Sequence, residues 1–183
     1  MKLSSCVFLF AAGSLAFAQG PVKVTKASAP VKALIFEADI PALLDEVWAA
    51  FTTNDGLSTW LTPNATVELK KGGDWLAHFP GGGSGGGTIL SYRPKEEIVM
   101  SAMAPPQFPH VREERTTAAW QFRAVAPKTT RVVLTQTGWK PGDEWDKAYE
   151  YLADGNKQLL ETLQQRFVTG PIDWAKVFGP QPK

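Results

Sequence analysis

The chain has 183 residues, which is the length of one ordinary domain and too short for two comfortable ones. Its 19 Lys and Arg residues almost balance its 18 Asp and Glu residues, so the chain offers no general field for a polyanion and we expect no nucleic-acid partner. The hydrophobic share of 44% excludes a wholly disordered chain, and the single cysteine, Cys6, excludes a disulfide framework and a cysteine-ligated metal site.

The first 18 residues have the pattern of a secretory signal peptide. Lys2 provides a short basic start, residues 6–18 form an apolar stretch, and a small-x-small pattern ends at Ala18, directly before Gln19. A transmembrane helix needs about 20 apolar residues, which neither this stretch nor any other provides, so we expect no membrane span. The sequence therefore predicts cleavage after Ala18 and a mature protein that is secreted or periplasmic.

The segment after the leader changes from an irregular stretch to a strand and then to helices. Residues 19–30 contain prolines and show no periodicity, which is typical of a flexible lead-in. Residues 31–38 alternate loosely between apolar and polar side chains and predict a strand. Residues 42–52 carry apolar side chains at helical spacing, and residues 57–61 predict one further short turn of helix. A strand followed by a short helix pair is therefore expected.

After this helix pair the hydrophobic period changes to two, which predicts short strands joined by turns. The expected strands are at residues 65–69, 75–79, 88–92, 98–103, 117–125 and 131–137. Residues 104–115 combine prolines with charged residues and predict a long loop.

The last large element is expected to be a long helix over residues 143–167. Its apolar side chains form one stripe at helical spacing, and the stripe opens with Trp145, which we expect to be buried against the sheet. This order of elements predicts an α+β fold, in which a curved antiparallel sheet of about six to seven strands wraps around the C-terminal helix. We expect one domain over residues 31–170, followed by a C-terminal tail of residues 171–183.

Two features of the sequence suggest a cofactor or a metal, but neither has the neighbouring elements or the spacing that such a site needs. The glycine-rich run at residues 81–87 formally contains GxGxxG, but a dinucleotide site needs that motif between a strand and a helix. Strands are expected on both sides, so the run is interpreted as a flexible hairpin tip. His78 and His110 are the two histidines, and they lack the spacing of a zinc site. We therefore expect no nucleotide, metal or other cofactor, and the sequence assigns no catalytic residue.

The expected packing brings aromatic side chains together on one face of the sheet, beneath the long helix. A cupped sheet lined in this way is a typical place for an apolar pocket, although simple core packing also explains each tryptophan. The candidate cavity-lining residues are Trp60, Trp75, His78, Tyr92, Trp120, Tyr149 and Asn156. Asn156 stands on the apolar stripe of the helix, so water, a strand residue or a ligand must satisfy its amide.

A series of short segments occurs in an order that resembles the SRPBCC (START-like, helix-grip) superfamily. The branch that the chain resembles most is the one related to the activator of heat-shock-protein-90 ATPase, over residues 33–170. The matching segments are 47–52 (VWAAFT), 57–60 (LSTW), 71–73 (KGG), 87–90 (GTIL), 98–99 (IV), 130–135 (TRVVLT), 138–139 (GW) and, in the last helix, Trp145 and Gly155.

The resemblance implies a helix-grip fold with a cavity that commonly holds lipids, polyketides or other apolar molecules in this superfamily. Relatives often carry Trp after the helix glycine, whereas this chain has Asn156 after Gly155, which leaves room as well as polarity in the cavity. The resemblance implies no co-chaperone role, because the Asn- and Trp-rich motif of the true activator is absent and an exported protein would not meet a cytosolic chaperone.

The expected function is therefore an exported small-molecule-binding domain with an apolar ligand, and not an enzyme. Two alternatives remain open at this point. One is a cyclase-, aromatase- or hydrolase-like enzyme that uses a few polar groups in the same cavity. The other is a protein-interaction module whose cavity is filled by its own side chains.

Overall fold

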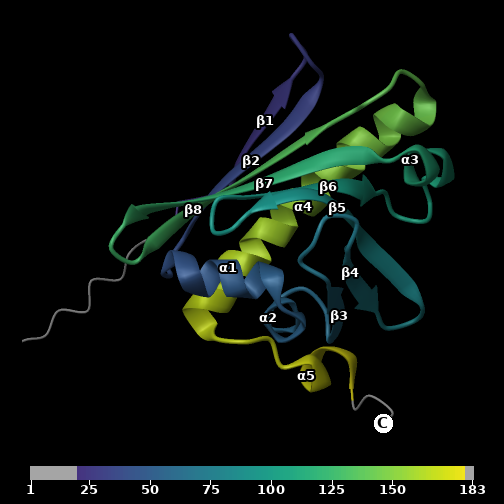
Figure 1. The fold of residues 1–183 in the computed structure, drawn as a ribbon. Coiled ribbons are helices and arrows are strands. Elements are labelled where there is room, and N and C mark those ends of the chain that lie inside the picture. Colours follow the sequence, from purple (N-terminus) through teal and green to yellow (C-terminus); the bar gives the residue numbers. More distant parts are fainter. Residues whose placement is uncertain (1–19, 180–183) are drawn as a thin grey trace, which may run out of the picture.

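The structure is a computed structural model, and it describes residues 20–179. Eight antiparallel strands form one curved sheet in the order β1-β2-β8-β7-β6-β5-β4-β3, and the long helix α4 crosses its face (Figure 1). The strands are β1 (Lys23–Ala27), β2 (Ala33–Ile40), β3 (Asn64–Val67), β4 (Asp74–Phe79), β5 (Gly83–Arg93), β6 (Glu97–Met103), β7 (Thr116–Ala126) and β8 (Thr129–Thr137). The helices are α1 (Leu44–Thr52), α2 (Asn54–Ser58), α3 (Pro109–Glu114), α4 (Asp143–Thr169) and α5 (Trp174–Phe178).

This architecture confirms the predicted α+β, helix-grip fold with a helix pair ahead of most of the sheet. The strand count is higher than the predicted six to seven because β1 lies in the segment 19–30, which was expected to be a flexible lead-in. Its backbone pairs with β2, with Val24 opposite Phe36. The side chains of β1 are mostly exposed, so an edge strand of this kind leaves no apolar period in the sequence.

The segment 104–115 was expected to be a long loop, but it contains α3. Pro109 is suited to the first turn of that helix, and Val111 is fully buried. The first turn is capped by a residue that is distant in the sequence. Glu144 Oε1 on α4 accepts hydrogen bonds from the backbone N–H groups of His110 (2.8 Å) and Val111 (3.0 Å). A carboxylate also suits the positive end of a helix. The helix therefore depends on a contact 33 residues away in the chain, which no local pattern shows.

The centre of the core is a cluster of aromatic rings around Phe51 of α1. The ring centroid of Phe51 lies 5.1 Å from that of Trp60, 5.0 Å from that of Trp120 and 4.9 Å from that of Phe122. It also lies 6.4 Å from the centroid of Trp75, in a stacked arrangement. Such ring pairs stabilise a core beyond the area that they bury. The helix pair is thereby fixed on the same sheet face that α4 covers.

Trp145 belongs to a second, smaller apolar cluster at the N-terminal end of α4. Its side chain is buried, as predicted, but its neighbours are Phe108 and Val111 at α3, together with Ala104 and Ala148. The expectation that it packs on the sheet itself is therefore wrong. The extra helix α3 lies near this end of α4 (Figure 1) and provides the apolar surface that covers the indole.

The predicted signal peptide, residues 1–18, lies outside the described residues. Within residues 20–179, no helix is both long and apolar enough to cross a membrane. The C-terminal tail contains the short helix α5, and Trp174 fixes it to the domain by donating a hydrogen bond from Nε1 to the backbone oxygen of Ser58 (2.6 Å). Val177 and Phe178, on the same short helix, remain largely exposed.

An ion pair on the outer face of the sheet makes the free energy of unfolding depend slightly on pH. Arg131 of β8 donates to both carboxylate oxygens of Asp39 on β2, at 2.7 and 2.9 Å, and these hydrogen bonds lower the pKa of Asp39 below its ordinary value. A lowered folded-state pKa stabilises the fold above the unfolded pKa, and this contribution disappears as the pH falls through the folded value.

We therefore expect Asp39→Asn to lower the free energy of unfolding by about 0.5 kcal/mol at pH 7, a small effect because the pair is partly exposed. The difference between variant and wild type should disappear in acid, below the folded-state pKa of Asp39. Urea melts over a series of pH values measure both. A difference that grows as the pH falls would contradict this assignment.

A candidate ligand pocket between the sheet and the long helix

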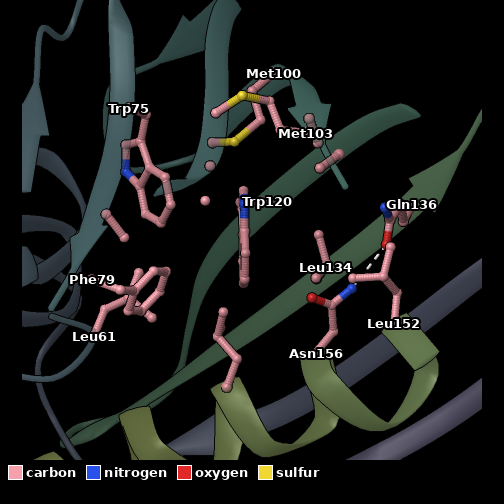
Figure 2. Close-up of a pocket in the computed structure, with 16 residues that line it drawn as sticks. Leu61, Trp75, Phe79, Met100, Met103, Trp120, Leu134, Gln136, Leu152 and Asn156 are labelled. Carbon is pink, nitrogen blue, oxygen red and sulfur yellow. Dashed lines mark hydrogen bonds between the residues drawn. The ribbon is translucent and has the colours of Figure 1, made fainter. Parts of the chain in front are cut away.

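A cavity of about 120 Å³ lies between the inner face of the sheet and α4 (Figure 2). Strands β4 to β8 provide one wall, and Leu152, Asn156 and Leu159 of α4 provide the other. The two faces meet there because inward-facing side chains alternate along each strand while α4 presents one stripe to them. The position is the one expected for a helix-grip cavity.

The sheet side of the pocket is hollow because four neighbouring strands place small residues on their inner face. These residues are Ala77, Gly85, Ala102 and Ala118. Ala77 and Gly85 lie directly opposite each other across β4 and β5, so neither strand fills the space in front of this pair. Two large, buried rings, those of Trp75 and Trp120, border the space. The small residues thus leave the space that becomes the cavity, and the two indole rings form its rigid border.

The glycine-rich run contributes to this wall instead of forming a free hairpin tip. Residues 83–87 belong to β5 and pair with β4, which corrects the expectation of a flexible tip. Phe79, at the end of β4, lies against the backbone here: its ring atom Cε2 is 3.4 Å from the position that a Cβ on Gly85 would take. Phe79 is 41% exposed, so it forms the rim at which the pocket meets solvent.

A short chain of amide and hydroxyl groups provides the polar part of the pocket. Asn156 Nδ2 donates a hydrogen bond to Gln136 Oε1 on β8 (2.8 Å), and Gln136 Nε2 donates to Thr116 Oγ1 on β7 (2.8 Å). Gln136 and Thr116 are buried, whereas Asn156 is partly exposed. A strand residue was one of the predicted partners of Asn156, and this residue is Gln136; the asparagine also borders the cavity.

Of the seven predicted lining residues, the structure brings Trp75, Trp120 and Asn156 together at the pocket. Trp60 instead lies in the core, where it is fully buried and donates from Nε1 to the backbone oxygen of Ala50 (3.0 Å). Its indole packs against α1, where the ring of Phe51 is its neighbour, and it does not border the cavity.

The other three predicted residues also lie away from the pocket. His78 faces outward from β4, and its Nε2 atom is 2.9 Å from Thr66 Oγ1 on β3. Tyr92 lies near the end of β5 and is 36% exposed. Tyr149 is buried on α4, where its hydroxyl donates to the backbone oxygen of Ala33 (3.0 Å). His78 was misplaced because its strand alternates with Ala77 inward, which puts the imidazole on the opposite face.

Sequence reasoning missed the most buried polar residue of the site, Gln136. The period-two pattern of its strand contains the signal, because Val132, Leu134 and Gln136 share one face of β8. The rim residue Phe79 was also missed, although it shares a face with Trp75. Alternation alone shows which face a residue is on, but not that the facing strands leave a space there.

The chemistry of the lining is apolar and uncharged. None of the described residues that border the pocket carries an ionisable side chain. Within residues 20–179, no three His, Cys, Asp or Glu side chains are grouped so that they could hold a metal ion. The pocket can therefore offer dispersion contacts, aromatic faces and amide hydrogen bonds to a ligand.

Comparisons with known proteins agree with this architecture. The family model described as "Activator of Hsp90 ATPase homolog 1-like protein" matches residues 41–167. No curated protein sequence matches the chain. Solved structures that are similar include the protein MLL2253 from Mesorhizobium loti, with 19% identity, a TM-score of 0.63 and coverage of 77% of this chain and 100% of that one.

Two further structures show the same likeness. The Aha1 dimer from Colwellia psychrerythraea has 18% identity and a TM-score of 0.60, and the match covers 75% of this chain and 97% of that one. CalU16 from Micromonospora echinospora has 18% identity and a TM-score of 0.56, with coverage of 85% and 86%. At such identities the likeness shows a shared fold.

Proposed function

Because the chain belongs to the activator of Hsp90 ATPase homolog 1-like family, we propose that it is an exported protein that binds a small apolar molecule in the pocket beneath α4. The observation that carries this proposal is the cavity itself, which has apolar walls from both the sheet and the helix. Concave apolar sites with a few polar groups are the usual form of small-molecule sites. The export part rests on the pattern of the first 18 residues.

The composition of the pocket favours binding over catalysis by the chain's own side chains. General acid–base and nucleophilic catalysis need ionisable or nucleophilic groups at the reacting atoms, and the described lining residues provide none of the usual ones. An interaction module with a filled cavity is also less well supported, because small residues such as Ala77 and Gly85 keep the space open.

Native mass spectrometry of the protein purified from its own host tests the binding proposal. The matched variant is Gly85→Leu, because a Cβ at Gly85 meets only the Phe79 ring, at 3.4 Å, and the longer side chain points into the pocket. We expect the wild type to retain a small apolar molecule and the variant to lose it without loss of folding. The same bound mass on both proteins, or none on either, would contradict the proposal.

The export proposal predicts a defined N-terminus. The secreted or periplasmic product should begin at Gln19, because the small residues at positions 16 and 18 suit a signal peptidase. N-terminal sequencing of the exported protein measures this directly. The variant Ala18→Trp should keep the leader attached, since a large side chain does not fit the cleavage pattern. A folded, exported wild-type protein that still carries Met1 would refute the prediction.

A further inference from the structure

The size of the pocket limits the ligand that it can enclose. Its volume is about 120 Å³. An engineered cavity of about 150 Å³ in another protein binds benzene, and pockets for drug-sized ligands span roughly 300–1,000 Å³. A single six-membered ring is therefore about the largest rigid group that this cavity can enclose, unless Phe79 moves outward at the rim.

The border of the cavity suits an aromatic ring in particular. Trp75 and Trp120 provide two indole rings, and the thioether of Met100 lies beside them (Figure 2). Aromatic groups prefer stacked or edge-to-face contacts with other rings, and a methionine sulfur makes favourable contacts with ring edges. All three side chains are buried, so they form a fixed border.

The amide network contains one oxygen, Asn156 Oδ1, that receives no hydrogen bond from the described residues. Each end of the Gln136 amide makes one hydrogen bond within the protein, because Oε1 accepts from Asn156 and Nε2 donates to Thr116. Among the described residues none is seen to donate to Asn156 Oδ1, and this oxygen is not sealed away from solvent. Figure 2 shows it on the side of Trp120, directed away from Gln136. A carbonyl oxygen of an amide accepts hydrogen bonds, so the complementary ligand group is a donor.

The lining also determines the charge of the ligand. No described lining residue is ionisable, so neither a carboxylate nor an ammonium group would find an opposite charge in the pocket. A charge buried without a partner is strongly unfavourable. The ligand is therefore neutral where it is enclosed.

We propose that the preferred ligand is a neutral, single-ring aromatic molecule whose hydroxyl or N–H group donates a hydrogen bond to Asn156 Oδ1. This inference rests on the proposed function and narrows it to one chemical class, that of phenol or aniline. The ring would lie among Trp75, Trp120 and Met100, with its polar group toward α4.

Phenol and toluene provide the test, since they have the same ring and differ only in a hydroxyl in place of a methyl group. A purely apolar pocket binds toluene more tightly, because burial of an unpaired hydroxyl is costly. We expect the wild type to reverse that order and to bind phenol about tenfold more tightly, as measured by calorimetry. Anisole, whose oxygen cannot donate, should bind no better than toluene.

Asn156→Leu should abolish the preference for phenol over toluene, measured as the ratio of the two dissociation constants in the same variant. The matched control is Gln158→Leu, which makes the same amide-to-leucine change at an exposed position two residues further along α4 and should behave as the wild type. The comparison of phenol with anisole in the wild type tests, without any variant, whether the ligand needs a hydrogen-bond donor.

The outcomes separate this inference from the proposed function. If toluene binds the wild type as tightly as phenol, the role of Asn156 is overturned. If Gly85→Leu then abolishes the binding of both molecules, the pocket for apolar molecules is still supported. A preference for 1-naphthol over phenol would overturn the single-ring limit. If no aromatic probe binds the wild type while a small apolar molecule is retained in native mass spectrometry, the inference is overturned and the binding proposal stands.

Discussion

Trp145→Ala is expected to lower the free energy of unfolding by about 3–5 kcal/mol, the usual cost of removing a buried aromatic side chain. The indole is 6% exposed and packs with Phe108, Val111 and Ala148. Its ring also meets that of Trp139 edge-to-face, with centroids 6.5 Å apart. These contacts join the first turns of α4 to α3. Their loss leaves a cavity between the two helices, which the surrounding side chains do not refill.

A matched change at an exposed aromatic side chain controls for the general effect of the substitution. Phe178 of α5 is 44% exposed, and Phe178→Ala should cost less than about 1 kcal/mol in the same urea melts. A comparably small loss for Trp145→Ala would mean that the cluster around Trp145 does not contribute to the stability of the domain.

The sequence predicted those parts of the fold whose patterns are local and amphipathic. The long helix was expected at residues 143–167 and is observed as Asp143–Thr169, because its apolar stripe is continuous. Strand β1 and helix α3 were not predicted, for different reasons. β1 is held by backbone hydrogen bonds and exposes its side chains, while α3 depends on Glu144 and on the apolar surface of α4.

The candidate site could be predicted only in part, because a cavity depends on what several elements leave unfilled. The helix stripe correctly placed Asn156 at the pocket, and strand alternation placed Trp75 and Trp120 there. Trp60 and Tyr149 have equally suitable patterns but lie where the facing elements fill the space. Neither residue lies on a strand, so the packing of the helices against the sheet decides these cases, and no local pattern shows that packing.

The glycine-rich run shows this limitation most clearly, since glycine has no side chain from which a period of two could be recognised. In the structure, Gly87 lies opposite both Trp75 of β4 and Ala102 of β6. Gly85 lies opposite Ala77 and faces the pocket. The two glycines thus stand on the same face of β5, but only one of them has free space in front of it.

This contrast gives the second large expected effect. A Cβ on Gly87 would lie 2.1 Å from the backbone oxygen of Ser101, which cannot move without a shift of β6, so Gly87→Ala should cost about 3 kcal/mol. A Cβ on Gly85 would meet only the Phe79 ring, at 3.4 Å, which is ordinary contact. Gly85→Ala should instead raise stability by about 0.5 kcal/mol, because alanine reduces the freedom of the unfolded chain.

Urea melts of the two variants, made two residues apart in one strand, measure the difference directly. Because the substitution is the same, the unfolded-state effect is similar in both and the native contacts decide the sign. Equal losses for Gly85→Ala and Gly87→Ala would mean that β5 is packed alike at both positions, and that no open space exists in front of Gly85. The proposed pocket would then lack the open space on its sheet side. This pair of variants therefore tests the cavity independently of any ligand.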